Sequence, residues 1–338
     1  MMLSDQSHND SMRGQRLIRL TTIIGVIVAV VTLIIVLGDI NGAGKELSDI
    51  RWLPLIVMVA IALVSYCVRF ARWHRLLSIA AGSAGGYARS FVAFAAGGLL
   101  IFTPGRIGEA AKSIYALKLS GTPISASMPV ILAERINDVV VMVILAVVGL
   151  LIFGATGEVA ALAIGIGALF AIAGGLYVLF RLVVKSTAGP GPFGLYAFVR
   201  TSRSSVFSML GRRALTENFI FGMIAWSLEV AVFYLAMVAV GEPWGVEIFL
   251  IALAIYPLAS LAGALSMLPA GIGVTEGGLA GLAVALGGLD GDVALAATVL
   301  ARASILGTVV IIGLVMLPLP ARFQHPARID DRPSIQGS

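Results

Sequence analysis

Charged side chains inside long apolar stretches are the residues of this sequence that can carry chemistry. A charge in a membrane segment is costly, so such residues point by default to a functional site. The eight residues of this kind are Arg106, Glu109, Glu134, Arg135, Asp138, Glu229, Glu276 and Arg302. Glu134 and Asp138 share one helix face at a spacing of four, and Arg135 reaches Asp138 at a spacing of three. Two interpretations stay open for Arg135 and Asp138: a salt-bridge network between helices, and a substrate site.

Two short strings rich in proline and glycine contain further members of this set. Residues 104–109 and 269–276 share the pattern Pro-x-x-Ile-Gly followed by a carboxylate. Where a helix begins, free N–H groups and the positive end of the helix dipole attract anions, and Arg106 adds a bidentate fork. We therefore predict a phosphate-binding site. Its residues are Arg106, Arg135, Arg302, Gly105, Gly108, Gly271 and Gly273, the glycines chiefly because they permit tight turns.

The carboxylates of the set outnumber its cations by five to three, so not every carboxylate can be paired. Burial favours the neutral form of an unpaired carboxyl group. Glu109 and Glu276 occupy equivalent positions in the two strings, and we expect them to couple proton movement to transport. The alternative is that both only cap the helices that they begin. The predicted coupling and gating residues are Glu109, Glu134, Asp138, Glu229 and Glu276.

The composition indicates a membrane protein. Of the 338 residues, 59% are hydrophobic and 12% are charged, against about 45–50% and about 25% in soluble proteins. A soluble enzyme and a nucleic-acid binder are excluded, and the single Cys67 excludes a disulfide scaffold. The scattered His8, His74 and His325 indicate neither a metal site nor a catalytic base. We expect no cofactor and no bound metal.

Six apolar runs are long enough to cross a bilayer, which takes about 20 residues. They are 17–37, 53–76, 128–153, 159–180, 219–240 and 293–317. Two further stretches, 91–119 and 248–286, are interrupted by proline and glycine, and we interpret each as a re-entrant hairpin. The prediction is an all-α integral membrane protein with six transmembrane helices plus two re-entrant helical hairpins in an inverted repeat. The expected divisions are a cytoplasmic tail (1–16), a transmembrane domain (17–320, half-repeats about 17–153 and 159–318, cytoplasmic loop 182–217) and a second cytoplasmic tail (321–338).

Basic residues between the runs set the orientation, because Lys and Arg are enriched on the cytoplasmic side of a membrane. They gather before the first run, between the fourth and fifth runs, and after the sixth. Arg69, Arg72 and Arg75 are assigned to the cytoplasmic end of the second run. We therefore expect both termini in the cytoplasm and the protein in the inner membrane. The odd number of crossings in each half makes the halves inverted relative to each other.

Four motifs also resemble a known family. They are Arg72-Trp73-x-x-Leu-Leu77, Thr103-Pro-Gly-Arg-Ile-Gly-Glu-Ala-Ala-Lys112, Glu134-Arg135-x-x-Asp138 and Leu268-Pro-Ala-Gly-Ile-Gly-Val-x-Glu276. In this order they resemble the lysylphosphatidylglycerol synthase transmembrane family, from Arg16 to about Pro320. The resemblance implies a flippase-like domain that translocates or handles lipid. The synthases of that family carry a soluble transferase domain that is not in this sequence, so lysyl transfer is not expected.

The function we expect is a membrane lipid translocase for a polar or anionic headgroup, such as an aminoacyl-phospholipid, a polyprenyl-phosphate-linked lipid or a hopanoid lipid. One alternative is a secondary transporter of a small anionic solute. Another is a non-transporting membrane partner of a lipid-biosynthetic enzyme. We do not expect an enzyme, because no nucleophile–base pair is visible. The expected partners are a membrane lipid and, in the second alternative, that enzyme, with no nucleic acid; the oligomeric state stays open, a homodimer included.

Overall fold

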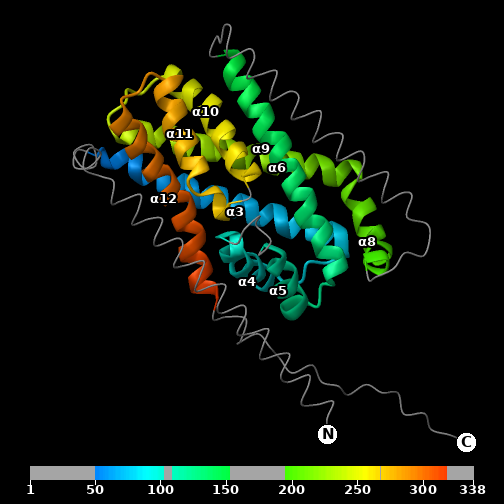
Figure 1. Cartoon of the computed structure of the whole chain (residues 1–338). Helices are drawn as coiled ribbons and strands as arrows, with labels where there is room; N and C mark the ends of the chain where they lie inside the picture. Colours follow the sequence, from blue (N-terminus) through cyan, green and yellow to red (C-terminus); the bar gives the residue numbers. More distant parts are fainter. Residues whose placement is uncertain (1–49, 103–108, 153–194, 267, 318–338) are drawn as a thin grey trace, which may run out of the picture.

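The computed structural model describes residues 50–102, 109–152, 195–266 and 268–317, and every element in them is helical. The helices are α3 (Trp52–Ala81), α4 (Tyr87–Gly98), η1 (Leu99–Phe102), α5 (Ala111–Ser120), α6 (Ile124–Ile152), α8 (Leu195–Met209), α9 (Arg212–Ala239), α10 (Val246–Leu265), η3 (Pro269–Gly271), α11 (Val274–Ala285) and α12 (Gly291–Met316). Figure 1 shows their arrangement.

Five of these helices are long and apolar enough to cross a membrane: α3, α6, α9, α10 and α12. At about 1.5 Å per residue, even α10 with its 20 residues spans roughly 30 Å, the thickness of the hydrocarbon core. Four of the predicted runs, 53–76, 128–153, 219–240 and 293–317, are therefore confirmed as continuous helices over their described residues, to within one residue of their ends. The runs 17–37 and 159–180 lie outside the described residues.

Glycine and aspartate set several helix ends. Gly82, at φ 76°, terminates α3, and Gly121, at φ 68°, terminates α5, both in the left-handed conformation that glycine adopts without strain. Asp290 precedes α12, and its side chain accepts the backbone N–H of Asp292 at 3.0 Å. These short-range signals are visible in the sequence.

Both interrupted stretches form helical hairpins. In 248–286, α10 ends at Leu265, η3 makes the turn, and α11 packs back along α10. In 91–119, α4 continues into η1, and α5 packs back along α4; residues 103–108 lie outside the described residues. α10 is longer than the half-helix predicted for this arm, whereas α11 has 12 residues.

Glycine permits the close approach of the two arms in each hairpin. A Cβ atom on Gly97 of α4 would lie 2.7 Å from the backbone nitrogen of Lys112 on α5. A Cβ atom on Gly263 of α10 would collide with Oγ1 of Thr275 on α11. Neither site has room for a side chain, so glycine at these two positions lets the arms pack closely.

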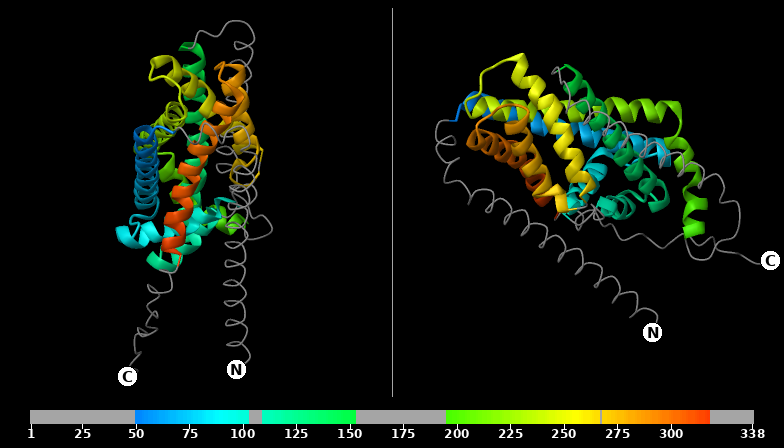
Figure 2. Two further views of the ribbon diagram at one scale, coloured as in Figure 1. Left: turned by 90° about the vertical axis from the view of Figure 1, so that its left-hand side faces the viewer. Right: turned by 45° about the horizontal axis from the view of Figure 1, so that its top comes forward.

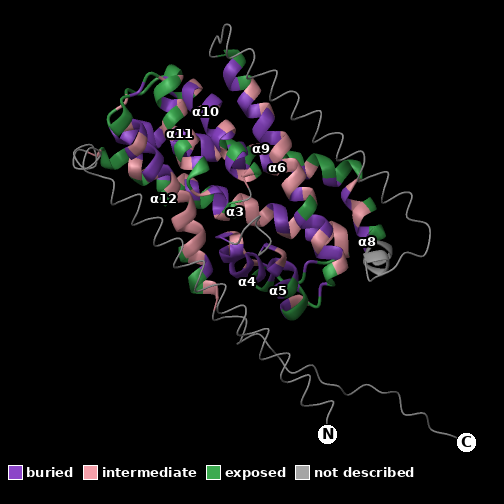
Figure 3. Cartoon of the chain, in the orientation of Figure 1, coloured by how far each residue is buried: buried purple, intermediate pink, exposed green. Residues whose placement is uncertain are grey.

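The two hairpins lie toward opposite ends of the bundle, and the end of the first arm of one contacts the turn of the other. α10 and α11 occupy one end in Figures 1 and 2, and α4 and α5 occupy the other. η1 of the first hairpin contacts η3 of the second. Around them α3 packs along α9, and α6 packs along α10. Buried residues, purple in Figure 3, gather where α6, α9 and α10 meet and within α4 and α5.

Candidate functional site

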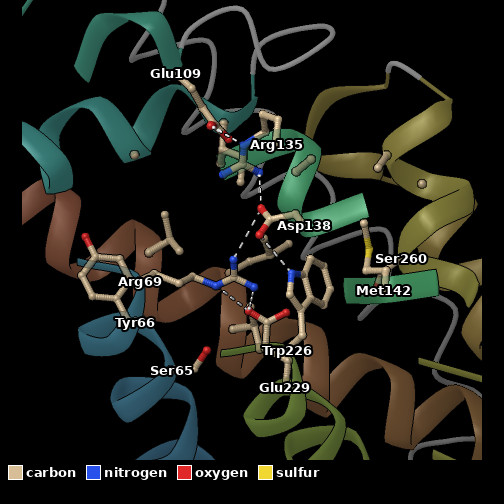
Figure 4. Close-up of a pocket in the computed structure, with 18 of the residues that line it drawn as sticks. Ser65, Tyr66, Arg69, Glu109, Arg135, Asp138, Met142, Trp226, Glu229 and Ser260 are labelled. Atoms are coloured by element: carbon tan, nitrogen blue, oxygen red, sulfur yellow. Dashed lines mark hydrogen bonds and ion pairs between the residues drawn. The ribbon is translucent and has the colours of Figure 1, made fainter. Parts of the chain in front are cut away.

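A cavity of about 560 Å³ lies where the two hairpins meet the long helices. Its lining comes from α3, α4, η1, α5, α6, α9, α10, η3, α11 and α12, and thus from both halves of the chain. The volume falls within the roughly 300–1,000 Å³ that is usual for small-molecule sites. Figure 4 shows the charged side chains that line one wall.

Asp138 on α6 is the centre of this charged wall. Its Oδ1 accepts Nη1 of Arg72 at 2.8 Å and the indole N–H of Trp226 at 3.2 Å. Its Oδ2 lies 3.1 Å from Nη1 of Arg135 and 3.9 Å from Nη1 of Arg69. One carboxylate from α6 is therefore shared by cations from α3 and α6 and by an indole from α9.

Arg72 is the most deeply buried cation of the network, with 1% of its side chain exposed. Besides Asp138, its Nε lies 3.5 Å from Glu134, whose side chain is 2% exposed. Gly222 on α9 leaves room for it, because a Cβ atom there would lie 3.3 Å from Nη1 of Arg72. Glu134 and Asp138 thus contact one partner, which confirms that they share a helix face.

Arg69 ties α3 to α9. Its Nε and Nη2 both donate to Oε1 of Glu229, at 3.0 and 2.6 Å. The other carboxylate oxygen of Glu229 accepts the hydroxyl of Tyr256 on α10 at 3.0 Å. The Arg69 guanidinium also lies 4.9 Å from the centre of the Trp226 ring, within cation–π range.

Arg135 faces the cavity beside the first hairpin. Its Nε lies 3.3 Å from Oε2 of Glu109, which begins the second arm of that hairpin. Lys112 lies 3.9 Å from the same oxygen and 4.7 Å from the ring centre of Phe94. Arg135 has 29% of its side chain exposed, the largest fraction among these three charged residues.

Arg302 on α12 makes the corresponding contact at the second hairpin, but with both edges of its guanidinium engaged. Its Nε donates to Oε1 of Glu276 at 2.6 Å, and its Nη2 donates to the carbonyl of Ala270 at 2.9 Å. The second oxygen of Glu276 accepts the backbone N–H of Gly273 at 2.7 Å. Glu276 therefore caps α11, as one of the two sequence interpretations requires, and holds Arg302 at the same time.

The structure brings five of the twelve predicted site residues together at one cavity. The members that line this one cavity are Glu109, Arg135, Asp138, Glu229 and Arg302. Glu134 lies behind this wall, paired with Arg72. Gly271 and Gly273 lie in the turn of the second hairpin, at φ 70° and 84°. Arg106, Gly105 and Gly108 lie outside the described residues.

The sequence analysis missed Arg69, Arg72, Lys112, Trp226 and Tyr256. Arg69 and Arg72 were assigned to the cytoplasmic end of the second run and left out of the set of charges inside apolar stretches; that omission is wrong, because α3 continues to Ala81 and both side chains pair inside the bundle. Their spacing of three on one helix face was the available signal. With them the inferred excess of carboxylates disappears. Within the described residues the cations Arg69, Arg72, Lys112, Arg135 and Arg302 match the carboxylates Glu109, Glu134, Asp138, Glu229 and Glu276.

The charged wall consists of ion pairs between arginine or lysine and carboxylates. Within the described part of the chain, no three His, Cys, Asp or Glu side chains come together in a way that could hold a metal ion. A charged group that enters such a wall can pair with its arginines or lysines in place of a carboxylate. Charge-assisted hydrogen bonds of this kind are short and strong in a water-poor site.

Comparison with known proteins identifies a family. The model of the lysylphosphatidylglycerol synthase TM region matches residues 22–313 of the chain. The match extends over all the helices that contribute charged residues to the cavity. A search of curated proteins finds no match.

Proposed function

Because the chain belongs to the family of the lysylphosphatidylglycerol synthase TM region, we propose that it is a membrane lipid translocase. A polar or anionic headgroup enters the cavity where the two hairpins meet, and the acyl or isoprenoid tails stay in the bilayer. The headgroup crosses as the two hairpins open in turn. The proposal is transport and not catalysis.

The observation that carries this proposal is the mixed lining of the cavity. Besides the ion pairs, the lining includes many apolar side chains, such as Ile101, Met128 and Ile305. Two of the apolar lining residues, Leu132 and Leu268, are 41% and 44% exposed at the protein surface. A charged wall with apolar side chains leading out to the lipid-facing surface suits an amphipathic substrate better than a free solute.

The ion pairs lower the free-energy cost of moving a charged headgroup through the bilayer. Moving a headgroup into the bilayer centre without partners is costly, because an isolated charge loses its hydration. In this cavity Arg69 and Arg135 already lie beside carboxylates, so an entering anion replaces an anionic partner. The exchange keeps every guanidinium paired throughout.

The membrane arrangement forms part of the proposal. Both hairpins are re-entrant and open to opposite sides, and the protein lies in the inner membrane with cytoplasmic termini. The contact between η1 and η3 and the opposite placement of the hairpins support this inverted arrangement. A cysteine at the exposed Gly288, beyond α11, should then react with an impermeant thiol reagent only from outside the cell.

Coupling to protons through Glu109 and Glu276 stays a prediction. The described charges are balanced, so neither carboxylate is forced to be neutral by a lack of cations. Transport in proteoliposomes under an imposed pH gradient tests it. If Glu109→Gln or Glu276→Gln flattens the response to the gradient, that carboxylate couples; a wild type that ignores the gradient identifies a passive scramblase.

The translocase proposal is tested by reconstituting the purified chain into liposomes that contain a trace of a tail-labelled fluorescent phospholipid. A membrane-impermeant reductant quenches the label in the outer leaflet only. The expected result is that the protein accelerates exposure of inner-leaflet phosphatidylglycerol and phosphatidic acid analogues relative to protein-free liposomes, whereas a diacylglycerol analogue, which has no charged headgroup and crosses without help, moves at the same rate with and without the protein. Uptake of a soluble organic phosphate with no lipid movement would overturn the proposal in favour of a solute transporter.

A further inference from the structure

We infer that Arg69 and Arg135 bind the phosphate of the substrate headgroup, and that Asp138 holds the two guanidinium groups in position when the cavity holds no substrate. The inference rests on the proposed function and specifies the ligand chemistry of the same cavity. It assigns a binding role to Arg69 and a positioning role to Asp138, and it removes Arg302 from the anion-binding set.

The two oxygens of Asp138 are in different situations. Oδ1 accepts two hydrogen bonds, from Arg72 and from Trp226, and these donors are almost fully buried. Oδ2 is buried and accepts no hydrogen bond from any described residue. Asp138 is therefore anchored by one oxygen, while the other faces Arg69 and Arg135 through charge alone.

The two arginines that face Oδ2 also have N–H donors that make no hydrogen bond to a described residue. Arg135 makes ion pairs with Glu109 and Asp138, yet its Nε is buried without a hydrogen-bond partner in the described part of the chain. Arg69 donates twice to Glu229, but among the described residues its Nη1 has only Asp138 nearby as an ionic partner, at 3.9 Å. Both line the cavity, and Asp138 lies between them in Figure 4.

The other cations of the network are less suited to this role. Arg72 does not line the cavity and is 1% exposed. Lys112 is 6% exposed and packed against an aromatic ring. Arg302 already donates from Nε and Nη2 to its own hairpin turn. Arg69 and Arg135, at 19% and 29% side-chain exposure, are the cavity-lining arginines with donors to offer.

A phosphate is the ligand that this geometry fits. Two guanidinium groups that converge on one carboxylate oxygen present several N–H donors to a single point, and tetrahedral phosphate oxygens accept such bonds bidentately. The phosphate takes over the donors that now face Oδ2, while Arg72 and Trp226 keep Asp138 in place. Asp138 competes with the phosphate and so favours release.

The test measures binding to the purified full-length chain in maltoside detergent by titration calorimetry. The probes are dihexanoyl phosphatidic acid, inorganic phosphate and dihexanoyl glycerol. Each charge-assisted hydrogen bond contributes about 1.5–3 kcal/mol, so Arg69→Gln and Arg135→Gln should each weaken phosphatidic acid binding about tenfold or more. Arg69→Lys and Arg135→Lys keep the charge for folding and should still lose most of the affinity, because an ammonium lacks the planar fork.

The matched control is Arg75→Gln, on the same helix as Arg69 but paired with Glu217 away from the cavity, and it should bind as the wild type does. Asp138→Asn keeps an oxygen for Arg72 and Trp226 but removes the charge that competes with phosphate, so it should tighten binding. Wild-type affinity in the Arg69 and Arg135 variants would overturn the binding role. Unchanged or weaker binding in Asp138→Asn would overturn the positioning role.

The binding experiment shows whether the phosphate belongs to a lipid or to a free anion, and the liposome experiment tests the translocase independently. Binding of phosphatidic acid well above that of inorganic phosphate, with none of dihexanoyl glycerol, supports a lipid headgroup. Equal binding of inorganic phosphate that still depends on Arg69 and Arg135 keeps the site and identifies a free anion as its ligand. Binding that depends on the arginines without any lipid movement in liposomes keeps the site and contradicts the translocase.

Discussion

The two hairpins are each held by an arginine–glutamate pair at the same spacing, but the two pairs differ in tightness. Glu109 and Arg135 are 26 residues apart along the chain, as are Glu276 and Arg302. The Arg302–Glu276 contact is 2.6 Å and is reinforced by the carbonyl of Ala270. The closest approach between Arg135 and Glu109 is 3.3 Å.

The surroundings of the two pairs explain this difference. The residues around Arg135 are Glu134 and Asp138, whereas the same positions around Arg302 are Ala301 and Ile305. Arg135 therefore divides its charge between two carboxylates, and Arg302 keeps one. The comparison indicates that the same pairing serves two purposes. The Arg302–Glu276 pair fixes its hairpin, and the Arg135–Glu109 pair stays exchangeable.

The largest loss of stability is expected from replacing Arg72, which pairs with Glu134 and Asp138 beside Arg135. Arg72→Met leaves Glu134 and Asp138 buried without their closest cation, and breaking a buried pair costs about 3–5 kcal/mol. Denaturant unfolding in detergent should show a loss of this size. Arg75→Met, which breaks a solvent-screened pair with Glu217, should cost far less. Similar losses in both variants would contradict a special role for the buried network.

Arg302→Gln should destabilise the fold more than Arg135→Gln does, if the two pairs serve these two purposes. Arg302→Gln removes two hydrogen bonds and leaves the buried carbonyl of Ala270 unpaired, which costs about 1–3 kcal/mol of folding free energy. Arg135→Gln should cost less stability, because within the described residues Arg135 forms ion pairs and its Nε makes no hydrogen bond. Thermal unfolding of both variants measures the difference. A larger destabilisation by Arg135→Gln would contradict the distinction between the Arg302–Glu276 pair, which fixes its hairpin, and the exchangeable Arg135–Glu109 pair.

The close approach within each hairpin is expected to give a smaller and equal effect. Gly97→Ala and Gly263→Ala insert a methyl group where Lys112 and Thr275 leave no room, and overpacking costs about 1–3 kcal/mol. Gly277→Ala on α11 meets nothing within 4 Å and should gain about 0.5–1 kcal/mol from helix propensity. Unfolding of the three variants checks this. A neutral Gly97→Ala would mean that the first hairpin is looser than the second.

Much of the helical architecture could be predicted from sequence, because hydropathy and glycine or proline act over short distances. The helices at 53–76, 128–153, 219–240 and 293–317 follow from their apolar length alone. The interruption near Pro269 follows from local backbone chemistry. The cap by Glu276 is equally local, since its partner Gly273 is three residues away.

The charged wall could be predicted only in part, because its partners are far apart along the chain. Arg72 and Asp138 are separated by 66 residues, and Arg69 and Glu229 by 160. A basic residue near the end of an apolar run has the same local appearance whether it meets a lipid headgroup or a buried carboxylate. The positive-inside rule therefore assigned Arg69 and Arg72 to the cytoplasmic end of an apolar run, and the charge count that left them out was wrong.

The most direct test of the account is the rate of lipid movement in liposomes that contain equal amounts of folded wild type, Arg135→Gln and Arg75→Gln, with tail-labelled phosphatidylglycerol and an external quencher. The account predicts that wild type and Arg75→Gln expose the inner-leaflet label at the same accelerated rate, while Arg135→Gln falls to the rate of protein-free liposomes. Lipid movement by Arg135→Gln at the wild-type rate would contradict it.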